Sequence, residues 1–181
     1  MKQMCIITDF RRLVLPVFVL MFALLSCKTG NNRFLELDIS NLPSLTVKYD
    51  TTVYFDSGRV VFKMIFPIME QYDNSEDPYY EFKMGLYTEV FNPSGSISAK
   101  YAKYIVNADL WELRDSVVVI NENQDKLETE SLFWSQPKDS IYTDRFVKFT
   151  NEDQIIMGTG FHSDSHLRRR KIFRTSATIY H

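Results

Sequence analysis

The sequence contains very few cysteines and alanines. Cys5 and Cys27 are its only 2 cysteines, so the chain beyond Cys27 has no pair for a disulfide or a cysteine-ligated zinc site. From Cys27 onward there are four alanines, whereas Val, Ile, Thr, Phe, Tyr and Trp together number 55. Branched and aromatic side chains fit pleated strands, and so few alanines exclude an all-helical bundle.

A hydrophobic run long enough to cross a membrane as a helix is also missing. The longest apolar run covers 13 residues, 13–25, and it follows a segment that carries Lys2, Arg11 and Arg12. A spanning helix needs about 20 apolar residues, whereas the apolar part of a secretory signal has about 7 to 15. We therefore predict a signal peptide over residues 1–26; the alternative is an uncleaved N-terminal anchor.

Cys27 is the predicted site of membrane attachment. The preceding residues, Leu24-Leu25-Ser26, with Cys27 resemble the lipobox of bacterial lipoproteins, in which the cysteine is acylated and becomes the new N-terminus. Acylation with two or three chains anchors a protein stably. We expect a tether over residues 27–44 and one domain over 45–181, outside the cytoplasm and held at a membrane.

The chain beyond the leader lacks an excess of basic charge. From Cys27 onward 18 basic and 22 acidic residues give a net charge of −4, so nothing favours nucleic acid as a partner. The exception is the segment 166–181, which has five basic residues and no acidic one. This segment either contacts phosphates or an acidic partner, or forms a charged sheet edge that resists aggregation.

Short strands separated by turn residues account for the pattern from residue 45 onward. Apolar residues alternate over 60–66 up to Pro67, which predicts a strand that ends or bends there. The clearest alternation runs over 79–90, which we predict to be one strand with an apolar and a solvated face. Further strands are expected around 96–106, 111–120, 127–134, 140–150, 154–161 and 171–179. This spacing predicts an antiparallel sandwich, barrel or roll.

A weak repeat at an offset of 29 residues supports a layered roll, although agreement by chance remains an alternative. Its matching pairs are Asp115 with Asp144, Val118 with Val147, Ile120 with Phe149, Leu127 with Ile156, and Leu132 with Phe161.

Motifs for catalysis are not found. The sequence has no phosphate-binding loop, no nucleophile elbow and no catalytic cysteine. His162, Asp164 and His166 would share one face of a strand and offer a metal site. Their Ser- and Asp-rich surroundings favour a turn instead. We predict a non-enzymatic protein without cofactors, and a metal-dependent hydrolase at these three residues is the alternative.

Several sequence blocks together resemble the LptC family, the periplasmic components of the lipopolysaccharide export machine. The blocks are Ala99-Lys100-Tyr101-Ala102, Leu110-Trp111-Glu112-Leu113-Arg114, Val117-Val118-Val119, Leu127-Glu128-Thr129-Glu130-x-Leu132-x-Trp134, Ile141-Tyr142-Thr143-Asp144 and Gly158-Thr159-Gly160-Phe161-x-Ser163. Family-motif residues with an expected structural role are Thr129, Leu132, Trp134, Thr143, Asp144, Gly158, Gly160 and Phe161. The resemblance covers roughly 45–180 and is strongest over 99–164. A lipobox departs from the transmembrane helix that is common in the family.

The resemblance implies an all-β, twisted and open antiparallel β-jellyroll whose interior holds the acyl chains of lipopolysaccharide. The interior residues that we expect to bind these chains are Phe62, Met64, Phe82, Met84, Leu86, Val118, Ile120, Leu127, Val147 and Phe149. Core packing alone is the alternative explanation for each of them. One sheet edge would receive the lipid from the inner-membrane ABC transporter, and the other would add strands to an LptA-like periplasmic protein. The expected downstream edge is the last strand, with Lys171, Phe173, Thr175, Ala177 and Ile179.

The leading hypothesis is therefore a lipopolysaccharide relay in the periplasm, tethered to a membrane, with the inner membrane favoured. The alternative of the same fold is a lipid-binding or envelope-assembly lipoprotein outside the export line.

Overall fold

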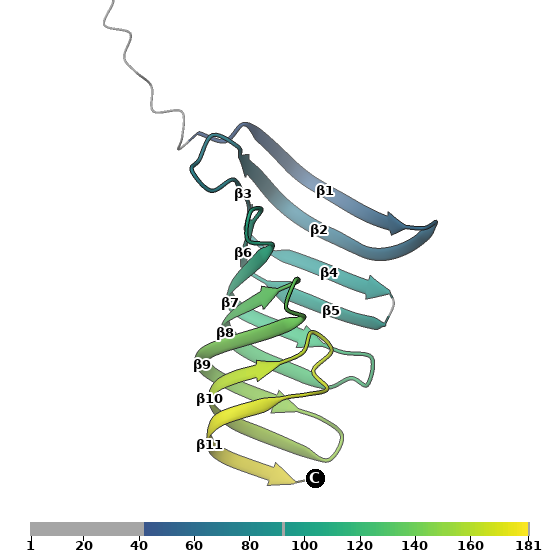
Figure 1. Ribbon diagram of the computed structural model, residues 1–181. Helices are drawn as coiled ribbons and strands as arrows, with labels where there is room; N and C mark the ends of the chain where they lie inside the picture. Colours follow the sequence, from purple (N-terminus) through teal and green to yellow (C-terminus); the bar gives the residue numbers. More distant parts are fainter. Residues whose placement is uncertain (1–41, 92, 181) are drawn as a thin grey trace, which may run out of the picture. The chain divides into compact units, whose positions relative to one another are not determined.

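The computed structural model describes residues 42–91 and 93–180 (Figure 1). All of them belong to one compact unit. The predicted signal peptide 1–26, Cys27 and most of the predicted tether lie outside the described residues. Within the described ranges, no helix has the length and apolar character needed to cross a membrane.

Eleven strands form the regular structure of the described residues. They are β1 (Leu45–Asp56), β2 (Arg59–Tyr72), β3 (Tyr79–Lys83), β4 (Leu86–Phe91), β5 (Ser94–Ala99), β6 (Tyr101–Ile105), β7 (Leu110–Ile120), β8 (Lys126–Ser135), β9 (Ser140–Thr150), β10 (Gln154–Ser163) and β11 (Lys171–Tyr180). One sheet contains them all, and every recorded pairing is antiparallel. The predicted all-β class is confirmed, and the sheet is consistent with the predicted β-jellyroll.

Two pairs of short strands pair side by side with one long strand: β3 and β4 both pair with β2, and β5 and β6 both pair with β7. β2 pairs with β4 over Phe62–Ile65 and with β3 over Ile68–Tyr72, so it changes partner at Pro67. In the same way β7 pairs with β5 on one side of the bend and with β6 on the other. β2 therefore continues through Pro67, where β4 gives way to β3 on one side and the register with β1 skips from Lys48–Ile68 to Asp50–Phe66 on the other. Such an irregular position suits a residue without an N–H.

The continuous strand predicted over 79–90 is wrong, because the chain breaks at Met84 and Gly85. Both residues have positive φ, 67° and 116°, which ends β3 and starts β4. Similar irregularities lie across the sheet. Asp115 and Ser116 have φ of 62° and 59°, and the Lys100 amide donates to the Asp115 carbonyl at 2.9 Å. Register shifts continue this line of bends through β8, β9 and β10.

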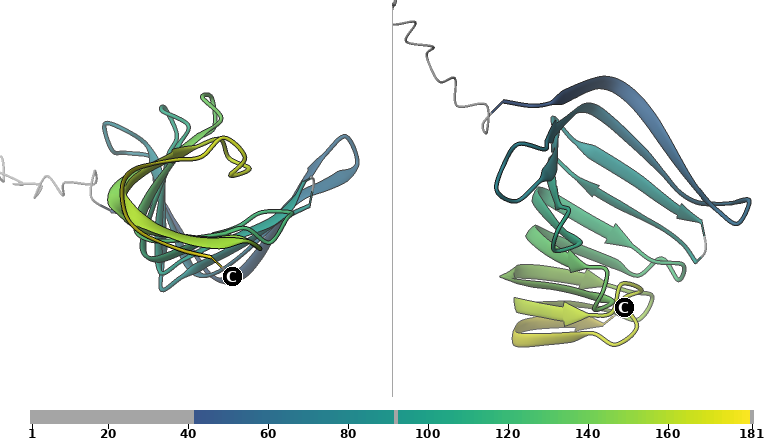
Figure 2. Two further views of the ribbon diagram at one scale, coloured as in Figure 1. Left: turned by 90° about the horizontal axis from the view of Figure 1, so that it is seen from below. Right: turned by 45° about the horizontal axis from the view of Figure 1, so that its top comes forward.

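The aligned bends fold the sheet so that one of its faces turns inward. Seen along the stack of strands, the sheet follows a curved outline that is open on one side (Figure 2). The inner face carries the core cluster: Met64, Phe66, Phe82, Leu86, Ala99, Ala102, Leu113, Val117, Val119, Leu127, Leu132, Ile141, Val147, Phe149, Phe161 and Leu167. Bulges that sharpen the twist are a usual means of bending a sheet in this way.

The repeat is present in the structure, and its predicted offset of 29 residues holds for β8 and β10 but not for β7 and β9. Val119 pairs with Leu127 as Phe149 pairs with Ile156, so equivalent residues lie 29 apart in β8 and β10 and 30 apart in β7 and β9. The hairpin β7–β8 is therefore used again as β9–β10. A shift of one residue in a strand exchanges its two faces, so the offset of 30 in β7 and β9 exchanges the residues of β7 that are expected to face inward.

Candidate functional site

An apolar pocket of about 310 Å³ lies on the inner face. Its walls come from β1, β2, β4, β5, β7 and β8 and from one residue beyond β8. The lining residues are Tyr54, Val61, Phe62, Met64, Leu86, Thr88, Val90, Ile97, Trp111, Leu113, Trp134 and Gln136. Ten of the twelve are aliphatic or aromatic, so the pocket offers dispersion contacts and removal from water to an apolar guest.

Aromatic side chains form a ladder along one row of the inner face. Tyr80 of β3 lies opposite Tyr104 of β6, Tyr104 opposite Trp111 of β7, and Trp111 opposite Trp134 of β8. The ring centroids along this row are 6.2, 4.9 and 6.4 Å apart. The ladder follows the direction in which the strands stack, and both of its tryptophans line the pocket.

The polar atoms of Tyr104 and Trp111 differ in their hydrogen bonding. The Tyr104 hydroxyl donates to Asp109 at 2.9 Å, and burial together with this carboxylate raises the pKa of Tyr104 to about 12. The indole N–H of Trp111 is buried and has no hydrogen-bond partner among the described residues. An unbonded buried donor is costly, and an acceptor oxygen that reached it would remove that cost.

Most of the predicted interior residues lie on the inner face, but they divide into two groups. Phe62, Met64 and Leu86 line the apolar pocket. Phe82 packs beside it, with its ring centroid 5.6 Å from that of Trp111. Leu127, Val147 and Phe149 instead lie fully buried in the part of the core formed by β8 and β9.

The structure corrects two of the predicted interior residues, Met84 and Val118, and places Ile120 beside a smaller second pocket. Met84 is 72% exposed, since it occupies the bend between β3 and β4. In this half of β7 the buried residues are Val117 and Val119. Val118 and Ile120 alternate with them and are only half-buried. The offset of 29 matched Val118 and Ile120 to Val147 and Phe149, whereas the strand offset of 30 matches Val117 and Val119.

Trp111 lines the pocket, although it was not among the predicted interior residues. It stood only within a motif block, whereas Trp134 was expected to have a structural role. Nothing in a period-of-two pattern indicates which aromatics meet across neighbouring strands, because the bends decide the register. The alternation of Trp111 with Leu113 and Val117 was a signal that could have found it.

The loop after β10, residues 164–170, folds back onto the core. Leu167 is 0% exposed and belongs to the core cluster, yet its φ is +60°. A leucine in the left-handed region is strained by about 1–2 kcal/mol. Nearby, the guanidinium of Arg170 lies 4.4 Å from the ring centroid of Phe149 and covers it. The packed part of the core is therefore closed by this loop.

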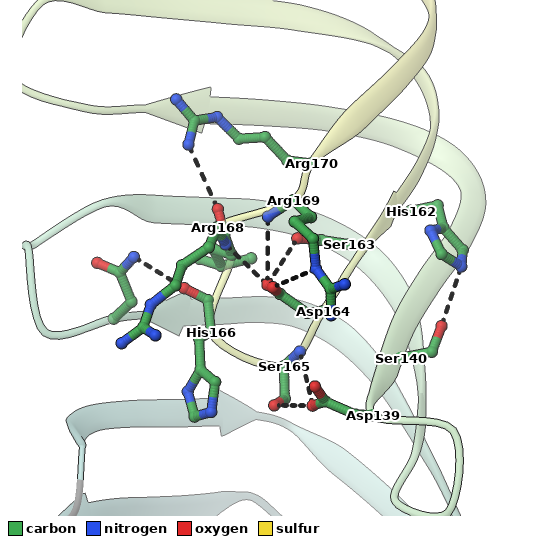
Figure 3. Close-up of polar contacts among 12 residues, drawn as sticks. Asp139, Ser140, His162, Ser163, Asp164, Ser165, His166, Arg168, Arg169 and Arg170 are labelled. Atoms are coloured by element: carbon green, nitrogen blue, oxygen red, sulfur yellow. Dashed lines mark hydrogen bonds and ion pairs between the residues drawn. The ribbon is translucent and has the colours of Figure 1, made fainter.

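Asp164 organises the loop (Figure 3). Its carboxylate is buried and accepts hydrogen bonds from the Arg168 amide at 2.8 Å and from Arg169 Nε at 3.2 Å. Burial alone would raise the pKa of Asp164, but these donors outweigh it, and the pKa lies below its usual value. The ionised carboxylate thus stabilises the loop.

Contacts with two hairpins hold the loop in place. Asn121 Nδ2 donates to the His166 carbonyl at 3.0 Å, and the hydroxyl of Ser165 donates to Asp139. Ion pairs link Arg168 with Glu122 at 2.5 Å and Arg170 with Asp125 at 3.9 Å. Three of the five basic residues of 166–181 therefore have acidic partners within the chain, Arg169 with Asp164 being the third.

The positions of His162, Asp164 and His166 do not fit a shared metal site. Figure 3 shows His162 turned toward Ser140, whose hydroxyl lies 3.0 Å from its Nε2, while His166 points away from Asp164. Within residues 42–91 and 93–180 no cluster of three or more potential ligands is present. The hydrolase alternative therefore has no site at these residues.

Several family-motif residues make hydrogen bonds or pack in the core. Thr129 Oγ1 donates to the Phe146 carbonyl at 2.8 Å, and Thr143 Oγ1 accepts from the Arg145 amide at 3.1 Å. Leu132 and Phe161 are buried in the core cluster, whereas Asp144 is exposed.

Two motif glycines leave space for the neighbouring strand β11. A Cβ on Gly158 would lie 2.5 Å from the Arg174 carbonyl oxygen, and one on Gly160 would lie 3.2 Å from Phe173. Gly160 also has a φ of +82°. Both positions therefore require a residue without a side chain.

Each end of the sheet is a free edge within the described residues. There, β1 pairs only with β2, and β11 only with β10. The predicted partner-edge residues lie on β11. Lys171, Phe173, Thr175 and Ile179 are exposed, and Ala177 is half-buried.

The sequence matches the family described as Lipopolysaccharide-assembly, LptC-related, over residues 13–181. The chain belongs to the LptC family. Membership implies a role in lipopolysaccharide transport as a component of the cell envelope that faces the periplasm. A search of curated proteins gave no match.

Proposed function

We propose that this LptC-family protein is a non-enzymatic relay for lipopolysaccharide. It accepts the lipid from the inner-membrane ABC transporter and passes it to an LptA-like periplasmic protein for assembly of the outer membrane. The observation that carries this proposal is the apolar pocket of about 310 Å³ on the inner face of an open sheet.

The pocket suits acyl chains because its walls are apolar and adaptable. Phe62, Met64, Val90 and Ile97 come from three different strands, and the two tryptophans supply wide aromatic faces. Met fills irregular space easily, which favours a guest whose chains vary in shape. The bulky sugars of lipopolysaccharide would remain in solvent on the open side of the fold.

A protein that binds and releases lipopolysaccharide without catalysing a reaction needs an external source of free energy for directional transport. Transfer of an acyl chain from one apolar groove to the next changes the buried area little, so it is close to neutral in free energy. A net flow along such grooves follows from ATP hydrolysis by the transporter, which loads the first groove.

Continuity with the neighbouring proteins uses the two free edges. β11 presents unpaired N–H and C=O groups to a strand of an LptA-like protein, and addition of that strand would extend the sheet. β1 occupies the other end of the sheet and is the edge nearer to the transporter in this arrangement.

Anchoring at the inner membrane keeps the relay beside the transporter. We propose acylation of Cys27 as the anchor. Incorporation of a labelled fatty acid that is lost in Cys27→Ala supports it, and unchanged labelling contradicts it.

Photo-crosslinking in cells tests the relay. Benzoylphenylalanine at Phe62 places the reactive group in the pocket, and the same residue at Ile65 serves as a matched control, because Ile65 follows in the same strand and is 41% exposed. We expect lipopolysaccharide adducts at Phe62 and few at Ile65. The proposal fails if Phe62 and other pocket positions give no adduct. Adducts that persist without any transfer to an LptA-like protein favour a lipid-binding lipoprotein outside the export line.

A further inference from the structure

The apolar interior ends at the loop 164–170, which we call the plug loop. The apolar pocket of about 310 Å³, called the main pocket below, adjoins a second pocket of about 100 Å³. The two pockets share the lining residues Val90, Ile97, Leu113 and Trp134. Ser165 and His166 of the plug loop line this second pocket. A chain that entered from the main pocket would therefore meet the plug loop next.

Behind the plug loop the interior continues as a packed core. Leu127, Val147 and Phe149 are each 0% exposed there. Leu167 inserts among the core residues, and Arg170 covers the ring of Phe149. The inner face is thus continuous from β2 to β10, but a part of the loop fills its far end.

A single apolar side chain fixes the plug loop in the core. Leu167 is the one residue of the plug loop in the core cluster, and it has a positive φ. The strain of this backbone conformation opposes the gain from burial. Two of its contacts with the hairpins lie at the surface, Arg168 with Glu122 and Ser165 with Asp139, whereas the contact of Asn121 with the His166 carbonyl is part-buried. Exposed ion pairs of this kind contribute little to stability.

We infer that the plug loop is a gate that closes the β9–β11 end of the apolar interior and has to move before an acyl chain can reach the β11 edge. This inference rests on the proposed function and adds a step to it. With the loop closed, acyl chains occupy the main pocket only. With the loop displaced, Leu167 leaves the core, and Leu127 and Phe149 become walls of a longer groove.

A disulfide that locks the plug loop tests the gate. Asp139→Cys with Ser165→Cys replaces two side chains that are in contact, and oxidation would join the loop to the β8–β9 hairpin. The full chain is used in cells that make lipopolysaccharide, with benzoylphenylalanine at Phe62 or at Phe149. Each single cysteine variant controls for effects of the substitutions.

We expect equal lipopolysaccharide adducts at Phe62 in the oxidised and reduced protein, and several-fold more adducts at Phe149 after reduction. Equal adducts at Phe149 in both states would overturn the gate, as would their absence in both while Phe62 reacts. Absence of adducts at Phe62 as well would instead count against the proposed function.

A second experiment avoids placing the bulky label at the fully buried Phe149. Benzoylphenylalanine at Ile172, a half-buried residue of β11 that packs against the core, replaces the label at Phe149. Leu167→Ser removes the apolar anchor of the plug loop. We expect Leu167→Ser to increase lipopolysaccharide adducts at Ile172 several-fold without reductant, while the adducts at Phe62 stay constant. Unchanged adducts at Ile172 would contradict the gate.

Discussion

The two ends of the folded sheet use the same inner face differently. Near β2, β4 and β7, Phe62 and Trp111 line an apolar pocket, whereas near β9 and β10 the matching face is filled by Phe149 and Phe161 and closed by Leu167. Both regions are apolar, so composition does not separate them. The difference is that at the β9–β10 end a side chain of the loop 164–170, Leu167, fills the space inside the sheet, whereas no loop among the described residues does so at the pocket.

This contrast predicts unequal costs for the same truncation at the two ends. Phe149→Ala leaves a cavity in a fully buried site and should lower the free energy of unfolding by about 3–5 kcal/mol. Phe62→Ala removes a ring that already faces a pocket and should cost only about 1 kcal/mol. Urea denaturation of both variants measures the difference. Equal losses would show that the pocket end is packed as tightly as the β9–β10 end.

The close contact of β10 with β11 predicts a local effect at the packed end. Gly158→Ala places a Cβ against the Arg174 backbone and should cost about 1–3 kcal/mol. The matched variant Gly58→Ala meets no atom within 4 Å, and its positive φ alone should cost about 1 kcal/mol. Amide hydrogen exchange in β11 should accelerate only in Gly158→Ala. Acceleration in both variants, or in neither, would contradict the assignment.

A charge placed in the pocket should affect lipid binding more than stability. Val90 is half-buried and lines the pocket, so Val90→Asp should weaken lipopolysaccharide binding at least about tenfold, or 1.4 kcal/mol, because a carboxylate is not desolvated by an acyl chain. Val106→Asp, at an exposed position on the surface, is the control. Binding to immobilised lipopolysaccharide would compare them, and equal binding by Val90→Asp and the parent chain would argue against the pocket.

The sequence predicted the strands and the apolar faces better than it predicted the register. Alternation identified Met64, Phe82 and Leu127 as inward because their strands keep a regular period between bends. It failed at Met84, where the positive φ of the break is invisible to a period of two, and at Val118, where one residue of offset exchanges the faces. The pocket itself depends on which strands meet across the bends, as with Trp111 and Trp134, and no local pattern contains that information.

The smallest expected effect is a dependence on pH at the packed end. The pKa of Asp164 is lowered in the folded protein, so its contribution to stability is present above its unfolded pKa of about 3.9 and is lost as the pH falls through the folded value. Asp164→Asn should therefore lower stability at neutral pH and flatten its decline below about pH 4. Thermal unfolding from pH 7 to pH 3 measures this. A decline as steep as that of the parent chain would remove Asp164 from the account.

Intrinsic fluorescence tests most directly whether the pocket is the lipid site, since the chain has 2 tryptophans and both, Trp111 and Trp134, line it. Titration of the purified protein with lipopolysaccharide should give a saturable change in tryptophan emission, reduced by Val90→Asp and retained by Val106→Asp. Binding detected by another method without any change in emission, or an identical change in Val90→Asp, would contradict the assignment of the pocket.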